Sequence, residues 1–188
     1  MSSNQLPTDY QAFIHKSRYA RWQEGTGNRE SWSETVTRFM DNIVIPKTGD
    51  DSYVREIEQA ILSLDVMPSM RSLMTAGPAA SRDNTSMYNC SYLAVNNIKS
   101  FDQAMFILLC GTGVGFSVER QNVSKLPEVP EKMFNSETTI VVKDSKEGWA
   151  KSLRQLIALL YSGEIPKWDV SKVRPAGARL KTFGGRAS

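Results

Sequence analysis

Histidine and cysteine are scarce in this sequence of 188 residues, which contains one histidine and two cysteines. Two cysteines cannot form the disulfide framework of a small secreted protein. The lone His15 cannot complete a Cys/His zinc site with Cys90 and Cys110, so the sequence predicts no metal site. A cysteine with a function should therefore act as a thiol. We expect a surface or packing role for His15 and a packing role for Cys110, which lies in an apolar helical segment.

Long apolar runs and clusters of one charge are also missing. The longest apolar runs, MFILLC and LIALLY, are far shorter than a membrane-spanning helix, and the start MSSNQLPTDY lacks the pattern of a signal peptide. Lysine and arginine are scattered among acidic residues, and the net charge is only +3. We expect a cytoplasmic protein without membrane or nucleic-acid binding. Its slight excess of cations would suit small anionic ligands or an ordinary solvated surface.

Apolar residues are abundant enough for a globular core, since they make up 40% of the chain. In the first half, apolar residues recur every three or four positions, which predicts helices. One helix should end at Pro46, and the next should begin near Asp51 or Ser52. Their core-facing positions are Trp32, Val36, Phe39 and Ile43, then Val54, Ile57, Ile61 and Leu62.

The second half is expected to mix strands and helices. Residues 68–84 are rich in Ser, Thr, Gly, Pro and Asn, which predicts a loop or several turns. The elements expected after it are a strand at 87–95, a helix at 101–110 with a Ser100–Gln103 capping box and a terminating Gly111, a half-buried strand at 114–118, a polar connection at 121–137, a short strand at 139–142 and a helix at 149–160 that Gly163 ends. No closing helix or strand is expected at the end of the chain.

Gly111, Gly113 and Gly115 lie within five residues and form the most conspicuous local feature. A dinucleotide-binding fingerprint needs the order strand, glycines, helix, whereas helix, glycines, strand is expected here. A Walker A loop is excluded because no Gly-Lys-Ser/Thr follows. Glycines let backbone approach a ligand closely, but a tight helix-to-strand turn would also need one. The residues alone leave both roles open.

Cys90, Ser69 and Arg71 are the other candidate site residues. Cys90 follows Asn89 in an expected strand just after a polar loop, where a scaffold could hold a thiol against a substrate. The alternative is a cysteine that packs as a small hydrophobe. Ser69 and Arg71 offer a hydroxyl and a guanidinium group, which can pair with phosphate oxygens. A turn-forming serine and a surface arginine would give the same pattern.

Seven short segments occur in the order of one enzyme family. They are SRYARW at 17–22, VMPSMR at 66–71, YNC at 88–90, GVGFSV at 113–118, EGW at 147–149, VRPAGA at 173–178 and FGG at 183–185. Each is weak alone, but together they span nearly the whole chain. The sequence resembles the adenosylcobalamin-dependent (class II) ribonucleotide reductases, most closely the monomeric type that reduces ribonucleoside triphosphates.

The resemblance implies an α/β fold. Residues 1–65 would form an N-terminal helical region, and residues 66–188 the first strands and helices of an incomplete ten-stranded α/β barrel. Residues 121–183 would hold a shortened form of the insertion that binds a deoxynucleotide effector in monomeric members, so an effector is a possible partner.

The resemblance also implies roles for individual residues. Cys90 would be one of two thiols that reduce a ribonucleotide after a cobalamin-initiated thiyl radical has taken its 3′ hydrogen, and a thioredoxin-type reductant would restore the pair. The residues near the substrate would be Ser69, Arg71, Asn89, Gly113 and Gly115.

The family's thiyl cysteine, its Asn and Glu partners, the second reducing cysteine and the C-terminal shuttle cysteines have no counterpart here. We therefore expect an N-terminal portion that is inactive alone and needs a C-terminal portion on a separate or spliced chain, which would bind most of the adenosylcobalamin. A split gene, an intein or artificial shortening would explain this. The alternatives are a non-catalytic nucleotide-binding or regulatory module and a degenerate structural piece. The preference for di- or triphosphates and a bacterial or viral source stay open.

Overall fold

The computed structural model describes residues 6–48, 51–180 and 186–187. The chain divides into two compact units between Asn89 and Cys90, which we call the N-terminal and C-terminal units. The sequence predicted a different division, between a helical region at 1–65 and the first part of a barrel at 66–188. That division stays a prediction. Among the described residues, no helix has the length and apolar character needed to cross a membrane.

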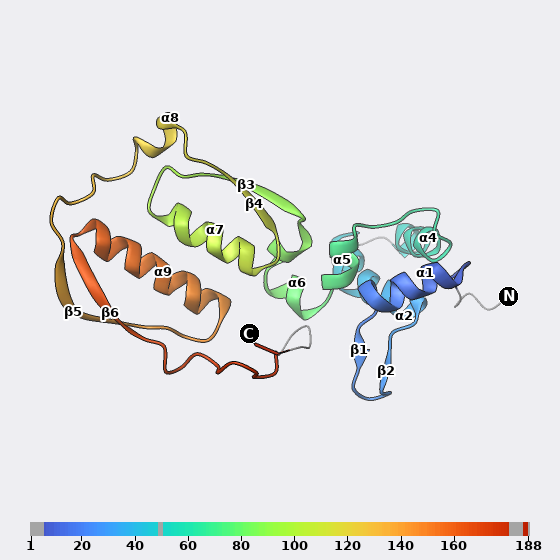
Figure 1. The fold of residues 1–188 in the computed structure, drawn as a ribbon. Coiled ribbons are helices and arrows are strands. Elements are labelled where there is room, and N and C mark those ends of the chain that lie inside the picture. The colour runs from blue at the N-terminus through green and yellow to red at the C-terminus, as the bar shows by residue number, and fades with distance from the viewer. Residues whose placement is uncertain (1–5, 49–50, 181–185, 188) are drawn as a thin grey trace. The chain divides into compact units, whose positions relative to one another are not determined.

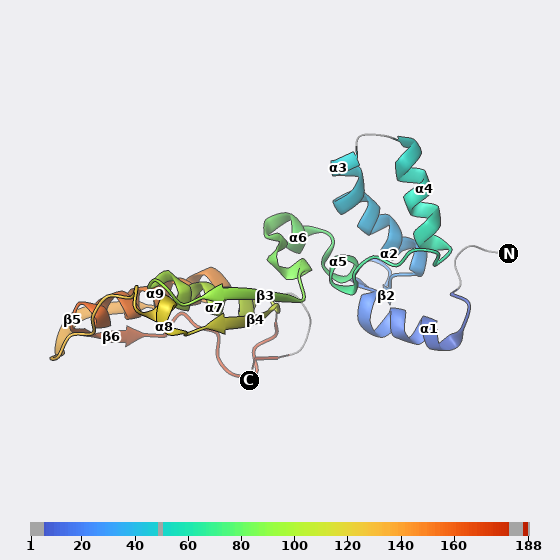
Figure 2. The ribbon, with the colours of Figure 1, turned by 90° about the horizontal axis from the view of Figure 1, so that it is seen from above.

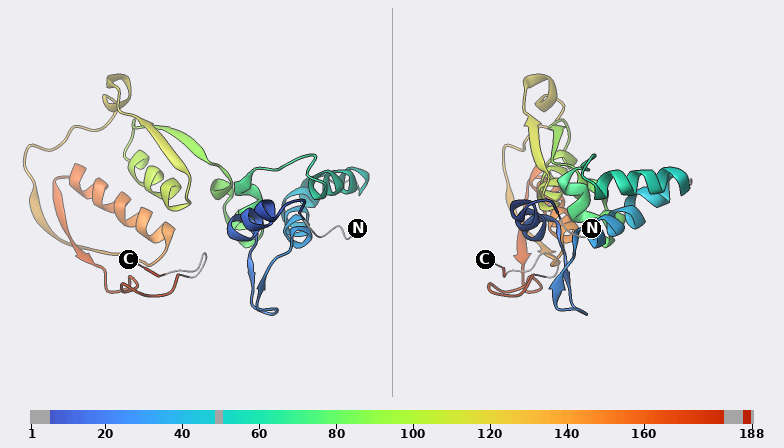
Figure 3. Two further views of the ribbon diagram at one scale, coloured as in Figure 1. Left: turned by 45° about the vertical axis from the view of Figure 1, so that its right-hand side comes forward. Right: turned by 90° about the vertical axis from the view of Figure 1, so that its right-hand side faces the viewer.

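The N-terminal unit is mainly helical, and its antiparallel β1–β2 hairpin projects from the helices (Figures 1 and 3). Its elements are α1 (Asp9–Ile14), the π-helical η1 (His15–Tyr19), β1 (Trp22–Gln23), β2 (Asn28–Arg29), α2 (Trp32–Phe39), the π-helical η2 (Met40–Val44), α3 (Ile45–Thr48), α4 (Asp51–Leu62), α5 (Met70–Thr75), α6 (Pro78–Arg82) and the 3₁₀ turn η3 (Asn84–Met87).

The core of this unit lies where α2 and its continuation pack against α4 and α5, and Figure 2 shows α4 alongside the α2–α3 run. A capping box between Ser31 and Glu34 starts α2. The predicted apolar stripe faces inward, which confirms both predicted helices. The buried core residues are Trp32, Val36, Phe39, Met40, Val44, Ile61, Leu73 and Ala76.

The prediction that Pro46 ends the first of these helices was wrong. The helix widens into a π turn, in which the N–H of Ile45 bonds to the carbonyl of Met40, and α3 then continues to Thr48. Proline has no N–H to donate, and it is accommodated here because the hydrogen-bond pattern changes from π to α at this point.

The loop expected at residues 68–84 was also wrong, because α5 and α6 lie within it. Ser69 caps α5 by accepting a hydrogen bond from the N–H of Ser72, and Pro78 stands in the first turn of α6. Gly77 between them has φ +114°, a conformation that favours glycine. The serine, proline and glycine that suggested a loop are the residues that start and separate two short helices.

The C-terminal unit contains two parallel strand pairs, β3–β4 and β5–β6. Helix α7 packs on the first pair, α9 packs on the second, and the two helices pack on each other (Figures 1 and 2). The elements are β3 (Cys90–Ala94), α7 (Lys99–Leu109), β4 (Gly113–Ser117), α8 (Arg120–Val123), β5 (Phe134–Val141), α9 (Lys146–Tyr161) and β6 (Glu164–Asp169). The mixture of helices and strands agrees with the predicted α/β class.

Several details of this unit differ from the expectations. Helix α8 and the start of β5 lie within the stretch 121–137, where a polar connection was expected. The Ser100–Gln103 capping box is wrong, because α7 begins at Lys99 and the hydroxyl of Ser100 donates to the carbonyl of Ala94 at 3.0 Å. Strand β6 was not predicted at all. Gly111 does end α7, with φ +83°, as its position suggested.

Candidate active site

Cys90 opens β3, and its thiol is free and exposed. In the parallel β3–β4 pair, Cys90 is in register with Gly113, and Tyr92 with Gly115. Because side chains alternate between the faces of a strand, Cys90, Tyr92 and the two glycines share one face. Leu93, which follows Tyr92, lies on the other face, where it lines a cavity with α7. The thiol therefore stands beside a stretch of backbone that has no side chains.

Only one glycine of the three-glycine segment is required by the turn itself. Gly111 has a left-handed φ, whereas Gly113 and Gly115 do not. A Cβ on Gly115 would meet only the carbonyl oxygen of Ser91, at an ordinary 3.7 Å. Chain folding thus explains Gly111 and leaves Gly113 and Gly115 exposed beside Cys90, where a ligand could approach the backbone.

The remaining candidate residues belong to the N-terminal unit. Ser69 is exposed at the start of α5, and Arg71 lies half-buried in the first turn of that helix. Asn89 is exposed and directly precedes Cys90. The structure thus brings Ser69 and Arg71 together on one helix, and Cys90 together with the glycines on one sheet face, with the two groups in different units.

A cavity of about 640 Å³ between α7 and α9 was not anticipated from the sequence. Asp102 of α7 is buried there and accepts a hydrogen bond from Nε of Arg154 at 2.9 Å through Oδ2. Its Oδ1 is buried and has no hydrogen-bond partner among the described residues. The hydrogen bond and the negative charge of Asp102 raise the pKa of Arg154. The sequence did contain one indication of this site, because Asp102 is an acidic residue within a largely apolar helical segment.

The other walls of this cavity combine apolar and charged groups. Phe106 and Leu93 are among its apolar residues, while Lys151 and Glu147 carry opposite charges. A buried carboxylate oxygen without a donor, next to two cations, suits a ligand that has both a hydrogen-bond donor and an anionic group.

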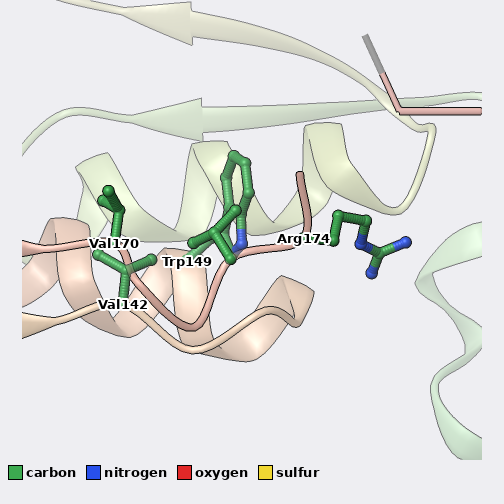
Figure 4. Close-up of a pocket in the computed structure, with 5 residues that line it drawn as sticks. Val142, Trp149, Val170 and Arg174 are labelled. Atoms are coloured by element: carbon green, nitrogen blue, oxygen red, sulfur yellow. The ribbon is translucent and has the colours of Figure 1, made fainter. Parts of the chain in front are cut away.

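A second, smaller cavity of about 320 Å³ lies at the start of α9 (Figure 4). The indole of Trp149 lies between Val142 and Val170 on one side and Arg174 on the other. The guanidinium of Arg174 is already paired, since its Nε donates to Oδ2 of Asp144 at 2.7 Å. This cavity is therefore largely apolar and offers fewer polar contacts than the one at Asp102.

Neither His15 nor Cys110 belongs to a candidate site. His15 is buried, its Nε2 lies 2.8 Å from Oγ1 of Thr35, and its ring meets Trp32 edge-on, which confirms a packing role. Cys110 is buried as expected, and Nζ of Lys146 lies 3.2 Å from its sulfur. Across residues 6–48, 51–180 and 186–187, no three His, Cys, Asp or Glu side chains are grouped so that they could hold a metal ion.

Comparison with known proteins confirms the resemblance seen in the sequence. The chain is 28% identical to the adenosylcobalamin-dependent ribonucleoside-triphosphate reductases of Lactobacillus leichmannii and Lactobacillus delbrueckii subsp. bulgaricus, over 93% of this chain and 33% of each relative. It is 25% identical to the enzyme of the same name from Lacticaseibacillus paracasei, with the same coverage. No family model matches the sequence.

The fold also matches a solved structure, described as a B-12 dependent (class II) ribonucleotide reductase. The TM-score is 0.72 at 22% identity, and the match covers 94% of this chain and 34% of the other. This chain therefore spans about a third of the length of the curated relatives that it matches. The alignment with the L. leichmannii enzyme runs over 245 residues, so that relative has additional residues inside the aligned region.

Proposed function

We propose that this chain is the N-terminal portion of a ribonucleotide reductase that uses adenosylcobalamin to convert ribonucleotides, with triphosphates preferred, to 2′-deoxyribonucleotides. The observation that carries the proposal is the exposed Cys90 thiol in register with the bare backbone of Gly113. Similarity to named reductases over nearly the whole chain supports the substrate class.

In the proposed reaction Cys90 supplies one of two reducing equivalents. A thiyl radical on a cysteine outside this chain removes the 3′ hydrogen of the ribose and later returns it. Cys90 and a second cysteine outside the chain give up two hydrogens and form a disulfide. The 2′-hydroxyl leaves as water, and a C–H bond replaces the C–O bond. A thioredoxin-type dithiol then reduces the disulfide by exchange.

Each candidate residue would have its own role toward the substrate. Gly113 and Gly115 would let the ribose approach the β4 backbone, and Asn89 would flank the redox thiol. Ser69 and Arg71 would bind the phosphate end, since a hydroxyl and a guanidinium both donate to phosphate oxygens.

The relatives are named as adenosylcobalamin-dependent enzymes, and we propose the same cofactor for the assembled reductase. The only histidine, His15, is buried and lies within hydrogen-bond distance of Thr35, so its ring has a packing role. We assign most of the adenosylcobalamin site to the C-terminal two-thirds of the reductase, where the cofactor would supply the initiating radical. That portion would also complete the ten-stranded barrel over strands whose apolar side chains, such as Tyr92 and Phe116, are exposed here.

The test is reconstitution of this chain with the remaining portion of a related reductase, adenosylcobalamin and a dithiol. We expect deoxynucleotide formation that Cys90→Ser abolishes without changing the melting temperature, because the thiol is exposed. Cys110→Ala is the matched control and should retain turnover. Full activity of Cys90→Ser would refute the assigned role. Tight nucleotide binding by the chain alone, with no effect of the remaining portion, would favour a regulatory module instead.

We further propose that the cavity between α7 and α9 binds the deoxynucleotide effector. Asp102 would accept a hydrogen bond from the ligand through Oδ1, and Arg154 and Lys151 would face its phosphates. In calorimetry, Asp102→Asn should weaken deoxynucleotide binding to the reconstituted protein while its basal turnover persists. Unchanged affinity would exclude this cavity as the effector site.

A further inference from the structure

Two arginines from distant parts of the N-terminal unit converge on the C-terminal end of α5. Arg38 of α2 donates from Nη1 to the carbonyl oxygens of Leu73 at 2.8 Å and Ala76 at 3.0 Å. Arg21 donates from Nε and Nη2 to the carbonyl of Met74, at 3.3 and 3.0 Å. The last carbonyls of a helix lack partners within the helix, so cations there supply both hydrogen bonds and favourable charge. We call Arg21 and Arg38 the arginine clamp.

Glu30 fixes the orientation of the clamp. Its two carboxylate oxygens accept hydrogen bonds from Nε and Nη2 of Arg38 at 2.7 and 2.8 Å. Its Oε2 also accepts from the backbone N–H of Arg21 and from the hydroxyl of Thr35. The side chains of Arg38 and Glu30 are only 12% and 8% exposed. A planar guanidinium can hold a carboxylate on one edge and carbonyls on another, which a lysine cannot do.

The clamp holds one end of a short, stiff element whose other end carries candidate site residues. Helix α5 is six residues long, which corresponds to about 9 Å. Leu73 is fully buried, and Ser69 and Arg71 stand at the opposite end. Where the chain leaves the clamped end, a Cβ on Gly77 would lie 3.0 Å from Nη1 of Arg21. A shift of the carbonyl end would therefore displace the end that carries Ser69 and Arg71.

We propose that Arg21 and Arg38 are positioning residues that hold α5 so that Ser69 and Arg71 meet the substrate phosphates. This rests on the proposed function, which gives Ser69 and Arg71 that role. Loss of the clamp weakens substrate binding and leaves the chemical step at Cys90 unchanged.

The experiment compares Arg21→Lys and Arg38→Lys with two direct variants, Ser69→Ala and Arg71→Ala, in the reconstituted reductase. We expect each clamp variant to raise KM for the ribonucleotide roughly fivefold or more while kcat stays within about twofold, the signature of lost uniform binding. Arg29→Lys is the matched control, because Arg29 also donates to a backbone carbonyl, that of Ala20 at 2.8 Å. It should leave both constants unchanged.

Amide hydrogen exchange of the chain alone provides a second readout. Both clamp variants should speed exchange at Leu73 and Ala76 by roughly tenfold, with protection of α2 retained. Unchanged exchange in α5 would overturn the proposal even without an activity assay. If Arg38→Lys does not fold, Arg21→Lys carries the test.

The kinetic outcomes separate the two proposals. If the direct variants leave KM unchanged, the substrate role of Ser69 and Arg71 is wrong. If they raise KM but the clamp variants do not, the positioning role is wrong. A clamp variant with a lower melting temperature and an unchanged KM has only a structural role.

Discussion

Glu30 is the residue on which the acid stability of the N-terminal unit should depend. Burial alone would raise its pKa, but hydrogen bonds from Arg38, the Arg21 backbone and Thr35, together with the charge of Arg38, lower the pKa below its usual 4.5. A carboxylate with a depressed pKa contributes stability above its unfolded value and loses it as the pH falls through the folded value. The free energy of unfolding should therefore decline as the pH falls below about 4.5.

Glu30→Gln tests this directly in denaturant titrations at several pH values. At pH 7 the variant should be less stable by about 3–5 kcal/mol, because Arg38 stays buried without its charge partner. It should also show a shallower decline in acid. Glu56→Gln, an exposed change on α4, is the control and should keep the wild-type profile. If Glu30→Gln lost as much stability at low pH as the wild type does, groups other than Glu30 would be responsible for the decline.

Individual site residues were predictable from sequence only where their neighbours in the chain define them. Cys90 was placed in a strand by its apolar neighbours, and Gly111 at a helix end by the run before it. The pairing of Cys90 with Gly113 was not derivable from local pattern, because it depends on the register of two strands joined through α7. The clamp was missed for the same reason, since Arg21 and Met74 lie 53 residues apart in the chain.

At the scale of elements, long amphipathic helices were predicted well and short segments were not. The stripes of α2, α4 and α9 give a strong periodic signal. Strand β6 was missed because Pro166 interrupts its pattern, although the proline is buried in the structure. Similarly, α5 and α6 are too short to show a helical period in the sequence. Their serine, proline and glycine residues therefore led to the prediction of a loop. Tertiary packing of Leu73 and Ala76 stabilises helices that local propensity does not predict.

Gly148, in the first turn of α9, should be required for the start of that helix. A Cβ there would lie 2.5 Å from the carbonyl oxygen of Lys143, which is backbone and cannot easily move. Alanine favours helix by about 1 kcal/mol over glycine, but overpacking costs about 1–3 kcal/mol. We therefore expect Gly148→Ala to lower the free energy of unfolding by up to about 2 kcal/mol in urea titrations.

The matched control is Gly115→Ala, because its Cβ would make only an ordinary contact with Ser91. That variant should unfold at nearly the wild-type urea concentration. If Gly148→Ala were as stable as the wild type or more stable, residues 143–145 would be able to move away from the added methyl group without loss of stability.

At the scale of the whole molecule, the C-terminal unit contains a parallel strand pair, β3–β4, with exposed apolar side chains. Parallel strands are normally buried on both faces, yet Phe116 in β4 is 63% exposed, and Val118, which directly follows the strand, is 59% exposed. The sequence predicted a half-buried strand at 114–118. A strand is present at Gly113–Ser117, and the described residues leave the side chain of Phe116 uncovered. Local pattern and propensity predict such a strand, but they do not reveal what covers its exposed side chains.

If the remaining portion of a reductase covers this surface, a charge on it should prevent association without unfolding the chain. Phe116→Asp should weaken binding of that portion at least roughly tenfold in calorimetry, because an aspartate would be buried without a partner. The melting temperature of the chain alone should stay unchanged, since the side chain is already exposed. Tyr53→Asp is the control, as Tyr53 is similarly exposed, at 61%, but lies on α4 of the N-terminal unit. If Phe116→Asp bound with wild-type affinity, this surface would be uncovered in the assembled protein. If Tyr53→Asp lost affinity to the same extent, the effect would come from added negative charge in general.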